Sequence, residues 1–485
     1  MTPQELDMLR HYLTAFGSRK EAEPMTLRLM DILLASKAPM SDGECSKKLY
    51  GKAKDNRYEK LKSRLKQKAL DSLINDINID RNKEWDDIEL VTIKLRKKLA
   101  QYYFLSLSKP NQPMIQHLLD EIILVAKKYE SYPVLTEALK FKKFNIGFKS
   151  GQGTYNKLNE EILHYEECQI AVSNAADVFF RMLLMQNFNS NIEKRKYLAF
   201  LKKNIKLLKN LYSKTNSSSV LYYLNILYRN LYVLIEDYES AGGTCRSILD
   251  DLEKNPAIYR KQRVGSTYLF LSQFELENNR ANEALQFAKN AKEYFPKKSI
   301  NYFAALDAEF HALWELQNYI EALTLAAHLV KENSEQKGSF RSAKYVFYGA
   351  CTQFQRRDFG TCLKSLLTNN ALAQDKSGWD LGLRTLIILT HVELGNYDLA
   401  SNAVEALRKH IERRDRDKAI RPRDKVIYQV LRSLSDASFN FALTWKQEQA
   451  KISLLQSDKP NYRWEHLGHE LVRVDNWIKD KVRIR

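Results

Sequence analysis

His466 and His469 are the residues of this sequence that come closest to a site for metal chemistry. On a helix, a spacing of three residues places both imidazoles on one face, as in half of a zinc site. No cysteine or third histidine stands close to them in the sequence. We therefore interpret both as surface or packing histidines, and we predict no metal site and no cofactor.

Signatures of catalysis are also missing. The glycine-rich run 147–153 has neither the spacing of a phosphate-binding loop nor an apolar strand before it. Adjacent acids such as Glu160 and Glu161 point in different directions on a helix, which suits shared acid–base work poorly. The nucleophile elbow, the zincin motif and the kinase motifs are absent. We predict that the chain is not an enzyme and has no catalytic residue.

Composition indicates where the protein works. The five cysteines are odd in number and include no C-x-x-C pair, which argues against a disulfide framework and fits a reducing cytoplasm. The N-terminus shows no apolar core of signal-peptide length, and no window approaches the roughly 20 uninterrupted apolar residues of a membrane span. We predict a cytoplasmic protein without membrane contact. The Lys-, Asn- and Tyr-rich composition suggests a bacterial source.

The net charge of +18 makes the protein basic, but its lysines and arginines are interleaved with acids along many segments. Such a balance attracts nucleic acids, acidic proteins and anionic surfaces alike, so the charge alone selects no partner.

The elements that must position any site are helices. Only 16 glycines and 10 prolines punctuate 485 residues, too few for the frequent turns of a sandwich or barrel. Apolar residues recur instead at three- and four-residue spacing, which is typical of helices. A chain of this length exceeds one simple core unless it grows by repetition. We predict an all-α protein built from repeats.

Five segments of the sequence align with one another, and they begin at Glu236, Asn279, Gln317, Arg357 and Gly395. In each, the third residue is aromatic, except for an alanine in the second segment. A small residue follows three positions later, and another apolar position follows four beyond that. The third positions are 38 to 43 residues apart. A period in this range is the signature of a solenoid.

This pattern resembles the tetratricopeptide repeat (TPR), with the fullest match in the second unit. That unit carries Tyr268, Leu271, Ala284, Ala288, Ala291 and Pro296. The spacing exceeds the usual period of about 34 residues, so helices or loops must be longer. The resemblance covers about residues 216–412. It implies antiparallel helix pairs stacked into a right-handed superhelix, with the first helix of each pair lining a concave groove.

The groove is where the resemblance implies that a partner binds. On this register the inward, partner-binding side chains are Tyr223, Asn230, Gln273, Asp307, His311, Trp314, Lys344, Phe347 and Phe354. The Lys and Asn of the carboxylate clamp that some TPR domains use are absent from their positions. An aromatic groove suits an amphipathic helix or an extended apolar peptide. The alternative is that several of these side chains pack between repeats.

The flanking regions extend the repeats. We predict four regions: an N-terminal helical domain (1–93), irregular hairpins (94–215), TPR-like repeats (216–425) and C-terminal capping helices (426–485). The expected helices of the second region are 94–107, 113–129, 132–148, 155–170, 171–188 and 192–212. The last helix should carry Trp464, Leu467, Leu471, Val474, Trp477 and Ile478 on one face and seal the open end of the solenoid.

The first 90 residues differ in character. Helices are expected at 24–36, at 41–50 with Ser41 and Glu44 as a capping box, and at 56–74. The third carries the basic residues Lys60, Lys62, Arg64, Lys66 and Lys68. This order resembles a helix-turn-helix reader of nucleic acid, with Ile77-Asn78-Ile79 as part of a wing. The alternative is a structural cap or a protein-docking domain.

These observations leave three functions open. The first is a non-catalytic scaffold or adaptor that holds a protein or peptide in its groove. The second is a regulator whose basic N-terminal domain binds nucleic acid while the repeats sense a protein or peptide. The third is a non-catalytic subunit of a larger complex. The sequence predicts neither the partner's identity nor the oligomeric state.

Overall fold

The computed structural model describes residues 3–15, 24–36, 40–75, 87–108, 113–186, 191–333, 339–375, 378–415, 420–459 and 461–483. Every regular element in these ranges is a helix, which confirms the predicted all-α class. The chain divides into two compact units, residues 1–85 and 86–485, each with its own core. The division therefore falls before the predicted boundary at residue 93, which lies within a helix.

The N-terminal unit consists of α1 (Pro3–Ala15), α2 (Met25–Leu34), α3 (Asp42–Tyr50) and α4 (Asn56–Asn75). Leu29, Cys45, Tyr58 and Leu61 form one small core, and α1 adds a second one through Leu9 and Leu13. The capping box of α3 is present, because Ser41 and Glu44 satisfy each other's backbone N–H groups. Helix α1 is an element that we did not predict. The suggested wing, residues 77–79, lies outside the described residues.

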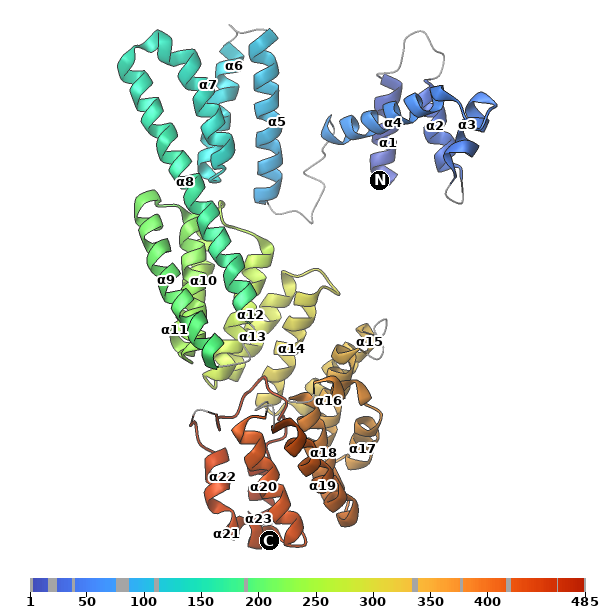
Figure 1. The fold of residues 1–485 in the computed structure, drawn as a ribbon, viewed down its shortest axis with the longest axis vertical. Coiled ribbons are helices and arrows are strands. Elements are labelled where there is room, and N and C mark those ends of the chain that lie inside the picture. The colour runs from blue at the N-terminus through green and yellow to red at the C-terminus, as the bar shows by residue number, and fades with distance from the viewer. Residues whose placement is uncertain are drawn as a thin grey trace. The chain divides into compact units, whose positions relative to one another are not determined.

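The second unit begins with long helices (Figure 1): α5 (Asp87–Ser108), α6 (Pro113–Lys128), α7 (Tyr132–Ser150), α8 (Gln152–Met185) and α9 (Asn191–Thr215). The predicted helices 155–170 and 171–188 are wrong as separate elements, since α8 is continuous. Neither proline nor glycine stands at the expected break, and Ala171 is buried at that point. Gly151, with φ of 82°, does separate α7 from α8 as expected.

Helix α8 is long and apolar enough to span a membrane by length and composition alone. Its buried residues, however, belong to two clusters of the core. Leu158, Ile162 and Cys168 pack with α5–α7, and Ala175 and Met182 pack with α9–α12. A core helix passes the same test of length and composition, and α8 joins two parts of the core in this way.

Helical hairpins follow in series along the remainder of the chain (Figure 1). The first helices of the hairpins are α10 (Ser218–Leu234), α12 (Lys261–Glu277), α14 (Ile300–Glu315), α16 (Phe340–Gln355), α18 (Trp379–Glu393) and α20 (Pro422–Asp436). The second helices are α11 (Tyr238–Lys254), α13 (Ala281–Glu293), α15 (Tyr319–Glu332), α17 (Phe359–Leu367), α19 (Tyr397–Asp415) and α21 (Phe441–Gln447). Two short helices complete the unit, α22 (Gln449–Leu455) and α23 (Val474–Arg483).

One turn geometry joins the two helices of each of the five predicted units. The first residue of every aligned segment is left-handed, with φ of 62°, 58°, 57°, 63° and 74° at Glu236, Asn279, Gln317, Arg357 and Gly395. The N–H of the next residue bonds to a carbonyl five residues back, as from Asp237 to Tyr232. This is a helix C-cap of the Schellman type. The same turn stands between α6 and α7 at Glu130, so the repeat begins within the region predicted to be irregular.

Small residues permit the helices to cross closely. Three positions after each helix start stand Ala241, Ala284, Ala322, Cys362 and Ala400, and all five are fully buried. The apolar positions four residues further on are buried as well: Cys245, Ala288, Ala326, Leu366 and Val404. Small side chains at such crossings bring two helix axes to the short end of the packing range. The prediction of a TPR-like hairpin solenoid is thereby confirmed, whereas the handedness of its superhelix stays a prediction.

The C-terminal end departs from the prediction that the last helix carries Trp464 to Ile478. Residues 461–473, named here the C-terminal segment, form turns without regular helix, and α23 begins only at Val474. Trp464, Leu467 and Leu471 therefore do not share a helix face. Leu467 packs beside Leu276, Ala284 and Ala312 of α12–α14. The segment crosses the first helices of the hairpins instead of sealing an end.

Candidate binding face on the first helices

The inner face is defined here as the side of the first helices that carries Tyr223, Gln273, Asp307, Lys344 and Thr385. It has two parts with different surroundings. From α14 to α20 the C-terminal segment covers it, whereas on α10 and α12 the segment reaches only the end of α12.

Ion pairs hold the beginning of the C-terminal segment to three first helices. The Arg463 guanidinium donates to the Glu277 backbone carbonyl at 3.2 Å and pairs with its carboxylate at 3.0 Å, at the end of α12. His466 Nδ1 lies 3.5 Å from the Glu315 carboxylate of α14. His469 Nε2 lies 3.1 Å from Asp424 of α20. The two histidines are thus packing residues, one of the two interpretations that the sequence left.

The backbone of the segment approaches α18 at Gly382. A Cβ on this glycine would lie 2.4 Å from the His469 carbonyl oxygen, so only glycine fits there. Around this point a small cavity remains, lined by Phe347, Cys351 and Thr385 on the helices and by Val472 on the segment. The segment therefore covers the inner face without filling it completely.

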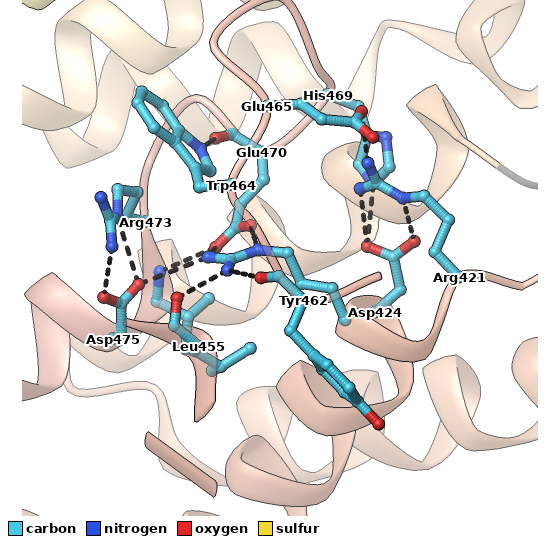
Figure 2. A network of polar contacts seen from close by, with 12 residues as sticks. Arg421, Asp424, Leu455, Tyr462, Trp464, Glu465, His469, Glu470, Arg473 and Asp475 are labelled. Atoms are coloured by element: carbon cyan, nitrogen blue, oxygen red, sulfur yellow. Dashed lines mark hydrogen bonds and ion pairs between the residues drawn. The ribbon is translucent and has the colours of Figure 1, made fainter. Parts of the chain in front are cut away.

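A buried arginine anchors the end of the segment (Figure 2). Arg423 of α20 is 1% exposed, and its guanidinium donates to both carboxylate oxygens of Glu470, at 2.5 and 3.2 Å. It also donates to the carbonyls of Leu455 and Tyr462, at 2.7 and 2.6 Å, and lies 3.5 Å from Asp475. Bidentate, charge-assisted bonds of this kind are strong and directional. They fix the point where the segment turns into α23.

A second ionic group lies beside the first (Figure 2). Arg421 pairs with Asp424 at 2.9 Å and with Glu465 at 2.5 Å, and it contacts the His469 ring. Burial alone would raise the pKa of Asp424, but the hydrogen bonds from His469 and Arg421 lower it to about 2. Burial raises the pKa of Glu277, against the opposing charges of His466 and Arg463.

Four of the predicted groove residues are buried: His311, Trp314, Phe347 and Phe354. Their burial fits the alternative that such side chains pack between repeats, because neighbouring hairpins and the C-terminal segment cover them; their part in partner binding stays a prediction. His311 Nε2 lies 3.0 Å from the Tyr348 hydroxyl, and burial lowers the pKa of His311 to about 3. Trp314 and Phe354 line a solvent-open space of about 690 Å³ opposite Trp464 and Trp477.

Asp307 and Lys344 remain partly exposed and pair with each other. The Lys344 ammonium lies 2.9 Å from Asp307 and 5.1 Å from the Trp379 ring. Burial raises the pKa of Asp307, while Lys344 opposes that shift. The two residues link α14 to α16, as an ion pair between adjacent hairpins.

The remaining predicted residues, Tyr223, Asn230 and Gln273, are half-buried on α10 and α12. Asn230 accepts from Gln186 at 3.2 Å and donates to the Ile226 carbonyl at 2.9 Å, so its amide is already bonded within the chain. The Tyr223 ring lies 5.4 Å from Phe179 of α8. Tyr223 and Gln273 are therefore the predicted side chains that a partner can reach most directly.

Arginines stand among the aromatic rings of α10 and α12, a feature that the sequence analysis missed. The Arg229 guanidinium lies 3.8 Å above the Phe270 ring, and that of Arg263 lies 4.2 Å above the Tyr222 ring. Arg260 pairs with Glu89 at 2.9 Å. The charges of all three arginines act on the Tyr222 hydroxyl and oppose the rise of its pKa on burial.

Arg229 is only 8% exposed, and burial lowers the pKa of its guanidinium. The groups that act on it in the described part of the chain are Phe270, Cys245, Tyr222 and Tyr197, and no carboxylate is among them. Arg229 directly precedes Asn230, which was predicted to face inward. The sequence analysis therefore overlooked an arginine next to a predicted site residue. The cluster of Arg229, Arg260, Arg263 and their aromatic neighbours is named the arginine–aromatic cluster below.

The basic residues predicted for nucleic-acid contact lie on α4. Lys60, Lys62, Arg64 and Lys66 are exposed and Lys68 is half-buried. Lys62 pairs with Asp42 of α3 at 2.5 Å. The others surround the solvent side of a helix whose opposite side forms the small core. Contact with nucleic acid stays a prediction.

Other chemistry finds little support in the described ranges. No group of three or more His, Cys, Asp or Glu side chains in them is placed to hold a metal ion. All five cysteines are buried free thiols, and burial raises the pKa of Cys245 and Cys362 to about 11. Such thiols remain protonated and unreactive near neutral pH.

The hairpins, their turns and the inner face define a helical-repeat protein of the tetratricopeptide type. No protein-family model and no curated protein matches the sequence.

Among solved structures, the chain is similar to the apo form of RapI (TM-score 0.48, 11% identity), over 80% of this chain and 98% of that one. It is similar to a Rap protein complexed with Competence and Sporulation Factor (TM-score 0.43, 11% identity), over 81% of this chain and 99% of that one. It is also similar to a STAND protein with a tetratricopeptide repeat sensor from Pyrococcus horikoshii (TM-score 0.40, 13% identity), over 86% of this chain and 65% of that one. The assignment of the fold rests on this chain's own turns and crossings.

Proposed function

We propose that this chain is a non-catalytic cytoplasmic scaffold or adaptor that binds a protein or peptide on its inner face. The accessible part of that face lies on α10 and α12, because the C-terminal segment covers the part from α14 to α20. Tyr223 and Gln273 belong to the accessible part, and the arginine–aromatic cluster lies beside them. The partner on this part carries an acidic group next to apolar or aromatic side chains.

The observation that carries the proposal is the presence of two guanidinium groups among aromatic rings, Arg263 half-exposed over Tyr222 and Arg229 buried over Phe270. A buried charge is costly unless an opposite charge or hydrogen bonds compensate it. Arg229 has the Phe270 ring at 3.8 Å and a hydrogen bond with the Cys245 thiol, and no carboxylate is among the groups that act on it in the described residues. A guanidinium binds a carboxylate with two parallel hydrogen bonds, and aromatic rings next to it bind apolar side chains. An acidic peptide or protein segment supplies both the carboxylate and the apolar side chains.

The test uses tagged full-length protein, purified from its host with and without nuclease. Arg263→Glu reverses a half-exposed charge of the cluster, and Lys289→Glu makes the same change on the exposed side of α13. We expect one stoichiometric protein partner that survives nuclease, is lost with Arg263→Glu and is retained with Lys289→Glu. A partner retained by both variants would refute the proposal.

The nuclease arm also tests the alternative, a regulator that binds nucleic acid. The exposed basic residues of α4 are the observation in its favour. If nucleic acid dominates the purified material and the proteins disappear on digestion, α4 becomes the functional centre. Phosphate contacts would then weaken steeply with salt, in proportion to their number.

A further inference from the structure

The two halves of the C-terminal region hold to the second unit by different forces. Residues 461–469 contribute ionic contacts: Arg463 to Glu277, Glu465 to Arg421, His466 to Glu315 and His469 to Asp424. Residues 471–478 contribute Leu471, Val472, Val474 and Ile478, which are buried in the main core. The pairs of Arg463 and Glu465 are partly exposed and contribute little net stability, whereas the contacts of His466 and His469 are buried. The first half is therefore held mainly by polar contacts and the second mainly by buried apolar area, which contributes steadily.

Both ends of the first half are defined. Before it, Asp458 and Lys459 are exposed and outside regular structure. After it, Glu470 is fixed by the Arg423 guanidinium. The stretch between can lift from the helices without disturbing α22 or α23 once the hydrogen bond from Arg423 to the Tyr462 carbonyl breaks, as a strap attached at two points. Solvent-open spaces of about 690 and 700 Å³ already border it, lined by Trp464 on the strap side of each.

The surface beneath the strap is mainly acidic, and its cation Arg421 pairs with Glu465 of the strap. Glu277 ends α12, Glu315 ends α14 and Asp424 starts α20, and the strap presents Arg463, His466 and His469 to these carboxylates. Trp464 packs against the same region, with its indole N–H bonded to the Glu470 carbonyl at 2.8 Å. The strap thus behaves as a bound ligand whose charge and aromatic content complement the helices.

We propose that residues 461–469 are a displaceable strap over the inner face from α12 to α20, and that a protein segment with basic and aromatic side chains takes their place. This proposal rests on the inner face being the binding face, as proposed above. The two parts of the face then differ in specificity. The arginine–aromatic cluster on α10 and α12 takes an acidic group, and the part under the strap takes a cationic one.

Hydrogen exchange on the unmodified full chain tests whether the strap lifts. We expect the amides of residues 461–469 to exchange at least a hundredfold faster than those of 474–478. Exchange of both stretches at one common slow rate would overturn the proposal, because the strap would then open only with the core.

A labelled synthetic peptide of residues 461–473 tests what the uncovered face binds. In the variant Arg463→Ser/His466→Ser the strap loses two of its side-chain contacts to the carboxylates beneath it, and we expect the peptide to bind at least tenfold tighter than to wild type. The control Arg432→Ser/Lys446→Ser removes two exposed cations elsewhere and should leave the affinity unchanged. Adding Glu277→Gln and Glu315→Gln to the strap variant should abolish the gain.

Equal affinity for wild type and the strap variant would overturn the proposal, as would a gain that persists after the glutamines are introduced. If the strap variant does not fold, the exchange measurement on wild type still decides. Neither experiment uses the partner of the arginine–aromatic cluster. If that partner is not found, the proposed function is refuted and the result for the strap still stands. If the strap experiments fail, the proposed function is likewise unaffected.

Discussion

Replacing Arg423 with methionine removes the only cation that contacts Glu470 in the described structure and leaves a side chain of similar length in its place. Glu470 then becomes a buried carboxylate without a cation, with only the Val474 N–H at 3.3 Å still donating to it. Breaking such a pair by removing one partner costs about 3–5 kcal/mol. Asp475 keeps a second cation, Arg473, at 2.8 Å, so the lower end of this range applies. A cost of about 3 kcal/mol corresponds to a roughly hundredfold shift in an opening equilibrium.

The assay is hydrogen exchange of α20 and α23 in Arg423→Met, with urea unfolding as a second readout. We expect the amides of both helices to exchange about a hundredfold faster than in wild type. The double variant Arg423→Met/Glu470→Leu removes the charge left behind, and it should recover most of the loss because apolar side chains can replace a buried ion pair. A loss below about 1 kcal/mol in the single variant, or no recovery in the double variant, would refute the reasoning.

Three further outcomes are expected. Gly382→Ala should destabilise the second unit by about 1–3 kcal/mol, because its Cβ meets the His469 carbonyl oxygen at 2.4 Å. The variant Gly349→Ala, whose Cβ meets nothing within 4 Å, should instead stabilise the second unit by up to about 1 kcal/mol. Equal changes in the free energy of urea unfolding for the two variants would contradict this account. The pKa of His311 is lowered to about 3 in the folded protein, so between its ordinary pKa and 3 only the unfolded state takes up the proton. Stability should therefore fall as pH drops through this window, by at most about 1.4 kcal/mol per pH unit, and less steeply in His311→Gln. Ala322→Leu should cost about 1–3 kcal/mol by overpacking a fully buried crossing, whereas a neutral result would place this crossing elsewhere.

The hairpins were predictable because their signals are local and repeated. The left-handed residue at Glu236, Gln317 or Gly395 closes a turn with the chain next to it, and Ala284 or Ala322 marks a crossing of neighbouring helices. Each signal recurs at a constant period, so five weak matches support one another. The capping box at Ser41 was predictable for the same reason, since its partners lie three residues apart.

The course of the C-terminal segment was not predictable because it depends on contacts distant in sequence. Trp464, Leu467 and Leu471 have helical spacing, which favoured a capping helix. The contacts that prevent it come from Glu277, Gly382 and other residues that only the folded solenoid brings near. Nothing in a single sequence indicates that a carbonyl oxygen will meet a glycine of α18.

The same limit applies at the candidate site. Which side chains surround a first helix depends on the crossing angle of its hairpin, so the sequence did not indicate that Arg229 packs on Phe270 of the next hairpin. Burial of His311 and Phe347 depends on the segment that covers them. Helical periodicity identifies one face of a helix, but it does not indicate whether water, a partner or the chain itself lies against that face.

The central claim is that a partner binds on the inner face at α10 and α12, and site-specific photo-crosslinking in the host tests it most directly. A photoreactive residue at Gln273 lies on that face, and the same residue at Gln286 lies on the exposed side of α13. The account predicts one crosslinked protein from Gln273, at high yield and unchanged by nuclease, and no such product from Gln286. The same product from both positions, or none from Gln273 while the partner still co-purifies, would contradict it.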